Sequence, residues 1–175
     1  LLDMNQDVLD FYQLSLDADL NTYQLIVSIY SRLPLLTETL GQIRANGTSL
    51  IASGNISDAD RSRLAFQIDN GRTALAQFSS NMNKVFSIEP DLKTTFSGLA
   101  QDANQQAQSA LQLADGIFVS GHASVSPVEY VRVFTQAINR YSELGNQSST
   151  RLQQMMDEQI DTKRKSQYVL LAGLL

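Results

Sequence analysis

The chain has 175 residues, with 43% hydrophobic and 7% aromatic residues, no tryptophan and no cysteine. It carries 13 Lys and Arg against 18 Asp and Glu, and the resulting net charge of −5 argues against nucleic acid as a partner, because phosphate binding requires a basic face. The length predicts one domain, and the absence of cysteine excludes disulfides, thiolate metal sites and cysteine nucleophiles.

The first predicted helix runs from Asp3 to about Ser53. Its apolar residues recur at near-heptad spacing, as Leu9, Tyr12, Leu16, Leu20, Tyr23, Ile26, Tyr30, Leu33, Leu36, Leu40 and Ile43. Pro34 lies within this pattern, and the apolar spacing continues in phase beyond it, so we expect one bent helix rather than two helices. We expect Gly41 and Asn46-Gly47 to loosen the last turns and Ser53-Gly54-Asn55 to end the helix.

A second helix is predicted to begin after Ser57, a good N-cap, with acidic residues in its first turn. Its apolar residues alternate in steps of three and four, as Leu64, Ile68, Gly71, Leu75, Phe78, Met82 and Val85. We expect it to end near Ser87, before a tight turn at Glu89-Pro90-Asp91. The third helix has a seam composed mostly of alanine, which lets a neighbouring helix approach closely: Leu92, Phe96, Leu99, Ala103, Ala107, Ala110, Leu113 and Ile117.

The last helix opens at Ser126, a good N-cap, with Pro127 suited to the first helical position. Its seam consists of Phe134, Ile138, Tyr141, Gly145, Ser148, Leu152, Met155 and Gln159. A charged stretch, 161–165, then gives way to eight residues, 168–175, that are apolar apart from Tyr168 and Gly173. Eight residues cannot cross a bilayer, which takes about 20, so we expect this run to be the start of a membrane span. The alternative is a terminal helix that packs its end beneath a neighbour.

Four helices with short connections predict an all-α fold, an antiparallel up-down-up-down four-helix bundle with long first and last helices, formed by residues 1–175 as one domain. In this topology both chain ends emerge at the same end of the bundle. The single histidine of the chain, His122, lies in a predicted loop with no carboxylate three residues away, which disfavours a metal site. No nucleophile–base pattern or phosphate-binding loop is present, so we expect no enzyme activity and no cofactor.

In architecture the whole chain resembles the periplasmic sensor domain of transmembrane bacterial chemoreceptors, the methyl-accepting chemotaxis proteins. The resemblance is carried by the segments 33–36, 40–47, 57–61 and 168–175. It implies a homodimer in the cell inner membrane, with this domain in the periplasm. It also implies a small ligand, an organic acid or an amino acid, bound near the membrane-distal end by the first and last helices. The last helix would carry the signal across the membrane.

Candidate ligand-binding residues follow from counting helix positions down from the distal loops. Arg44 then lies level with residues 131–136, which places Arg132, Thr135 and Gln136 at its height. Guanidinium groups with neutral donors suit a carboxylate ligand, and Thr135-Gln136 is similar to a Thr-Gln pair in the last helix of aspartate-type receptors. The alternative is that Arg44 and Arg132 lie on solvated faces.

Two other interpretations remain open. Related helical sensor domains occur on histidine kinases and diguanylate cyclases, so the output module can differ. The bundle can also be a structural spacer that binds no small ligand.

Overall fold

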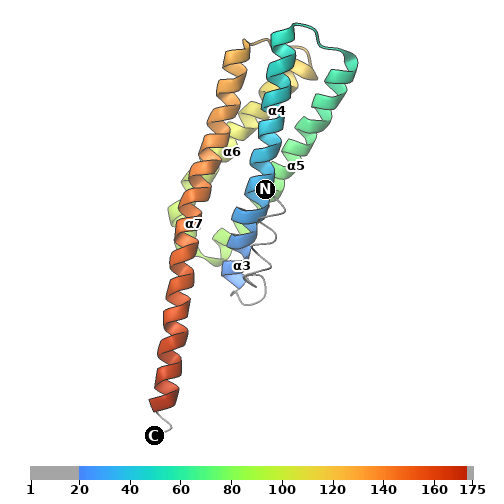
Figure 1. Ribbon diagram of the computed structural model, residues 1–175. Helices are drawn as coiled ribbons and strands as arrows, with labels where there is room; N and C mark the ends of the chain where they lie inside the picture. The colour runs from blue at the N-terminus through green and yellow to red at the C-terminus, as the bar shows by residue number, and fades with distance from the viewer. Residues whose placement is uncertain (1–19, 173–175) are drawn as a thin grey trace.

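Four helices follow one another up, down, up and down along the chain (Figure 1). The computed structural model describes residues 20–172. The first helix is continuous from α3 (Leu20–Val27) through a π-helical turn, η1 (Ser28–Arg32), to α4 (Leu33–Ser53). It is followed by α5 (Asp58–Ile88), α6 (Pro90–Phe118) and α7 (Pro127–Ala172). The described residues contain helices and no strands, so the predicted all-α bundle is confirmed.

The first helix passes through Pro34 without ending, as the sequence predicts, but the hydrogen bonding changes there. Proline lacks an amide hydrogen, so the α-helical pattern cannot continue through it. The amide of Leu33 donates to the carbonyl of Ser28, five residues back, which is the bonding of a π turn. The structural response to Pro34 is therefore a π turn in the residues that precede it.

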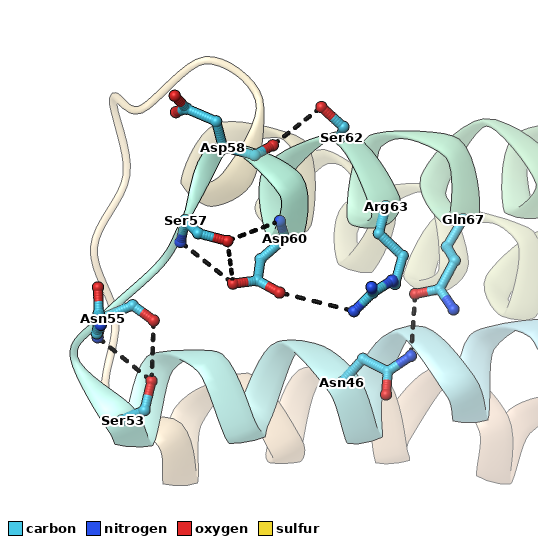
Figure 2. Close-up of polar contacts among 9 residues, drawn as sticks. All are labelled: Asn46, Ser53, Asn55, Ser57, Asp58, Asp60, Ser62, Arg63 and Gln67. Carbon is cyan, nitrogen blue, oxygen red and sulfur yellow. Dashed lines mark hydrogen bonds and ion pairs between the residues drawn. The ribbon is translucent and has the colours of Figure 1, made fainter.

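Capping residues set the other helix boundaries. At the start of α5, the Ser57 hydroxyl accepts from the Asp60 amide while the Asp60 carboxylate accepts from the Ser57 amide, both at 3.2 Å (Figure 2). The Ser57 hydroxyl also donates to the Asp60 carboxylate at 2.6 Å. This hydrogen bond, together with the one from the Ser57 amide, lowers the pKa of Asp60. At the start of α7, the Glu129 amide donates to the Ser126 hydroxyl. The tight turn expected at 89–91 is shorter than predicted, because Pro90 already belongs to α6 and only Glu89 separates it from α5.

Most predicted seam residues in the described part of the chain form the core, whereas Leu99, Leu113 and Ile138 are half-buried and pack against it. All seven apolar seam residues predicted for α5 are buried, and the alanine seam of α6 is buried between its neighbours. Gly47 does not loosen α4, which is helical up to Ser53. Instead Gly47 is buried, and a Cβ at this position would overlap the Tyr130 side chain of α7. Glycine is therefore required here by the close approach of Tyr130.

Helix α7 continues well past the end of the bundle formed by α3 and the α5–α6 connection (Figure 1). Its 46 residues correspond to a length of about 70 Å at 1.5 Å per residue. No helix among the described residues combines the length and hydropathy needed to cross a membrane. The span predicted to start within 168–175 lies outside the residues whose side chains are described, as does the whole segment 1–19.

Candidate ligand-binding site

Arg44 of α4 and Thr135 of α7 meet where the two helices pack together. The Arg44 Nη1 donates a hydrogen bond of 2.9 Å to Thr135 Oγ1, and both residues are half-buried. Their shared height was predicted from the sequence, and the structure adds the direct contact. This hydrogen bond joins the first and last helices of the bundle.

The hydroxyl of Thr135 is used differently from that of every other threonine in α4 and α7. The other five donate to the carbonyl four residues earlier in their own helix: Thr37, Thr39, Thr48, Thr150 and Thr162. Thr135 accepts from Arg44 instead. Among the described residues no acceptor takes its proton, so the Thr135 hydroxyl can donate to a bound molecule.

Arg44 carries a positive charge that no carboxylate in the described part of the chain balances. The ion pairs found there use Arg63, Arg72, Arg132, Arg140 and Arg151. Because the contact with Thr135 uses only Nη1, the Nε and Nη2 groups of Arg44 have no hydrogen-bond partner within residues 20–172. Two parallel N–H groups of this kind bind two oxygens of one anion.

Arg132 and Gln136 form a second group on α7. The Arg132 Nε donates to a Glu129 oxygen at 2.7 Å, its Nη2 donates to the other carboxylate oxygen, and its Nη1 donates to Gln136 Oε1 at 2.9 Å. The hydrogen bonds from Arg132 lower the pKa of Glu129, and the same contact raises the pKa of Arg132. The charge of Arg132 is thus balanced within its own helix.

The four predicted site residues therefore divide into two pairs. Arg44 and Thr135 lie at the α4–α7 contact, whereas Gln136 lines a hollow of about 520 Å³ between α6 and α7 together with Gln106 and Ser109. Glu129 was missed by the sequence reasoning, although its position three residues before Arg132 on one helix face is a recognisable signal. That all four residues bind a ligand stays a prediction.

Aromatic packing holds α4 and α7 in position beside Arg44. Tyr130 is fully buried, donates from its hydroxyl to the carbonyl of Ile43 at 3.2 Å, and packs edge-on against Phe118. The Phe134 ring also packs against Tyr130, with a ring-centroid distance of 4.8 Å. Because Ile43 and Phe134 directly precede Arg44 and Thr135 in sequence, this cluster defines the spacing of the two helices at the candidate site.

Comparison with known proteins identifies the family. Residues 3–156 match the family model described as NIT, nitrate and nitrite sensing. The chain belongs to the NIT family. NIT domains are extracytoplasmic helical sensor domains of signalling proteins such as histidine kinases and cyclases. No curated protein and no solved structure matches the chain.

The NIT match includes both halves of the candidate site, since Arg44 and Thr135 lie within 3–156, while α7 continues beyond it to Ala172. The predicted role as a helical sensor domain of a signalling protein is therefore confirmed at the level of the family. No group of three or more metal-binding side chains occurs in the described part of the chain.

Proposed function

We propose that this domain senses nitrate or nitrite by binding the anion between Arg44 and Thr135, and that it has no catalytic activity. Two observations support the proposal. The chain belongs to a family described by nitrate and nitrite sensing. In addition, the α4–α7 contact has an unbalanced guanidinium group next to a hydroxyl whose proton has no acceptor among the described residues. The second observation selects the site.

The chemistry of the ligand fits these two groups. Nitrate is a planar monoanion with three oxygens, and two of them match the spacing of parallel N–H groups as the oxygens of a carboxylate do. The Nε and Nη2 groups of Arg44 would bind two oxygens, and Thr135 would donate to an anion oxygen. A monoanion would balance the single positive charge of Arg44.

Binding at this position would bias the packing of α7. A ligand that binds both helices favours the arrangement in which Arg44 and Thr135 reach it together, and this shifts the population of the domain. In our proposal the domain is periplasmic and belongs to a homodimeric receptor of the inner membrane. The signal passes along α7 to a cytoplasmic output module. We favour a chemoreceptor, with a histidine kinase or a diguanylate cyclase as the alternative.

The proposal is tested by calorimetric titration of the purified domain with sodium nitrate and sodium nitrite, with ionic strength held constant by sodium chloride. Arg44→Ala should weaken binding about 10- to 100-fold, as expected for loss of charge-assisted hydrogen bonds. Thr135→Val keeps the side-chain shape and should weaken binding about 3- to 10-fold. Arg63→Ala is the matched control, because Arg63 lies on α5 with its side chain 68% exposed.

Each alternative has its own outcome. Wild-type affinity in Arg44→Ala would place the ligand elsewhere, and a larger loss in Arg132→Ala than in Arg44→Ala would move the site to the Glu129–Gln136 side of α7. Binding of an organic acid or an amino acid without binding of nitrate would restore the ligand class expected from the chemoreceptor resemblance. No binding of any of these compounds would favour a structural bundle.

A further inference from the structure

Two buried polar side-chain atoms lack a hydrogen-bond partner in the described part of the chain, and they lie at the same level of the bundle. They are Arg32 Nε and Ser148 Oγ. Arg32 closes the π turn η1 and donates from Nη1 to Gln77 of α5 at 3.2 Å. Ser148 lies on α7 and is fully buried. Buried polar groups are nearly always paired, so each exception requires an explanation.

The height of Ser148 along the bundle axis follows from a close contact one turn away on α7. A Cβ added to Gly145 would lie 2.7 Å from Leu33 Cδ2, so α7 touches the first helix where η1 meets α4. The two helices run antiparallel (Figure 1), and three residues further along α7 correspond to about three residues back from Leu33. Ser148 therefore lies at the height of the middle of η1, a segment that contacts α7.

The hydroxyl of Ser148 is unusual for its helix. Ser142 and Thr150 both donate to the carbonyl four residues earlier, which is the ordinary solution for a hydroxyl on a helix. Ser148 forms no such bond. The only other buried polar residue among the described ones, Ser28, lies in η1 and is satisfied by donating to Gln24 at 2.8 Å. A buried proton donor without an acceptor thus lies at the height of the π turn.

The π turn supplies an acceptor that lacks a donor. In a regular helix the Ile29 carbonyl would accept from the Leu33 amide, but that amide is bonded to Ser28. The next amide in the chain belongs to residue 34, which is proline and has no hydrogen. The carbonyl of Ile29 is consequently deprived of its helical donors, in the same layer as the unpartnered Ser148 hydroxyl.

We propose that the Ser148 hydroxyl and the Ile29 carbonyl form a hydrogen bond in a second arrangement of α7 against η1, and that the ligand-bound domain adopts this arrangement. The second part rests on the proposed function. Nitrate held between Arg44 and Thr135 would displace α7 relative to α4, and displacements of about 1–2 Å between packed helices are typical of such transitions. The hydrogen bond between Ser148 and Ile29 would form when α7 is displaced and break when it returns.

Ser148→Ala separates this proposal from a simple packing defect. Removal of an unpartnered buried hydroxyl should raise the melting temperature of the ligand-free domain by a few degrees. The same variant should bind nitrate about 3- to 10-fold more weakly, because the bound arrangement loses its hydrogen bond. Ser142→Ala is the matched control, since its hydroxyl is exposed and bonded within α7; it should change neither quantity.

A second readout does not depend on nitrate. Amide hydrogen exchange at residues 28–33 of the ligand-free domain should be slower in Ser148→Ala than in the wild type. The second arrangement, in which α7 is displaced from its packing against η1, becomes rarer in the variant. A lower melting temperature would show that the hydroxyl is already bonded, by protein or by buried water, and would overturn the proposal. A higher melting temperature with unchanged exchange would also overturn it. If the wild type binds no nitrate, the proposed function fails and the exchange result alone decides the two-arrangement proposal.

Pro34→Ala provides an independent variant at the acceptor. It restores an amide donor to the π turn, so the Ile29 carbonyl no longer needs Ser148. Nitrate affinity should fall as in Ser148→Ala, and the double variant should bind no more weakly than Pro34→Ala alone, because the two residues act through one bond. Additive losses in the double variant would contradict a shared hydrogen bond.

Discussion

Gly47 and Tyr130 show how single residues define the environment of Arg44. Tyr130 passes over Gly47, so that the aromatic ring occupies the space of a missing side chain and its hydroxyl reaches the carbonyl of Ile43. The position of the ring thus depends on glycine one turn along α4 from Arg44. Helix spacing at the candidate site is therefore determined by packing beneath it.

Gly47→Ala is expected to destabilise the domain by about 1–3 kcal/mol, the usual cost of overpacking a core. Its Cβ would overlap the Tyr130 ring and force it from the carbonyl of Ile43. Urea denaturation followed by circular dichroism measures the change. Gly41→Ala is the control, because a Cβ there meets nothing within 4 Å, and alanine should stabilise α4 by about 0.5–1 kcal/mol. Equal stability of the two variants would contradict this view of Gly47.

The heights of Arg44 and Thr135 could be predicted from sequence because a continuous helix has a constant rise per residue. Their angular positions could not, since these depend on how each helix is rotated in the bundle. The same reasoning placed Arg132 in the site although its guanidinium group turns to Glu129. Gly47 was interpreted as a loosening residue, because its partner Tyr130 is distant in sequence.

At the scale of helices, the sequence was most informative about where each helix begins. Ser57 and Ser126-Pro127 marked the starts of α5 and α7, since capping effects are local. Pro90 was expected in a turn, but it is the first residue of α6. The response to Pro34 was less predictable. A proline inside a helix is compatible with a bend or with a π turn, and the choice depends on tertiary packing.

Loss of the cap at the start of α5 should measurably destabilise the bundle. Ser57→Ala removes the acceptor of the Asp60 amide and is expected to cost about 1 kcal/mol at neutral pH. Guanidinium denaturation measures the difference. Ser62→Ala is the control one turn later, where the hydroxyl only donates to the Asp58 carbonyl (Figure 2); its effect should stay within about 0.5 kcal/mol.

The same variant has a defined pH dependence. The hydrogen bonds from Ser57 lower the pKa of Asp60 in the folded state, so their contribution is complete above the ordinary value of 3.8. It is lost as the pH falls through the lowered pKa. The stability difference between wild type and Ser57→Ala should therefore shrink below about pH 4. A difference that is constant down to pH 2 would show that the Asp60 carboxylate is not involved.

For the whole molecule, the buried tyrosines Tyr130 and Tyr141 lie along one core. Tyr141 donates from its hydroxyl to Asn104 of α6 at 2.7 Å, and its ring packs edge-on against Phe78 of α5, so this side chain connects α7 to both helices. Burial raises the pKa of both tyrosines well above their usual value. Ionisation of either is thus coupled to the integrity of the bundle.

Alkaline unfolding should follow from this coupling. A folded pKa above the unfolded value of about 10 means that stability is retained below pH 10 and lost as the pH rises further. Tyrosinate absorbance from these two residues should therefore appear together with the loss of helical circular dichroism. Tyr141→Phe should release about one proton fewer in the transition. Full ionisation near pH 10 with helicity intact would contradict their burial.

The length of α7 makes it a lever. About 37 residues separate Thr135 from Ala172 at the end of α7, a distance of roughly 55 Å at the helical rise. A pivot of only about 3° at Thr135 would swing the far end by roughly 3 Å, given that rise. A contact between two side chains and one small anion can in this way be converted into a movement as large as the ligand itself.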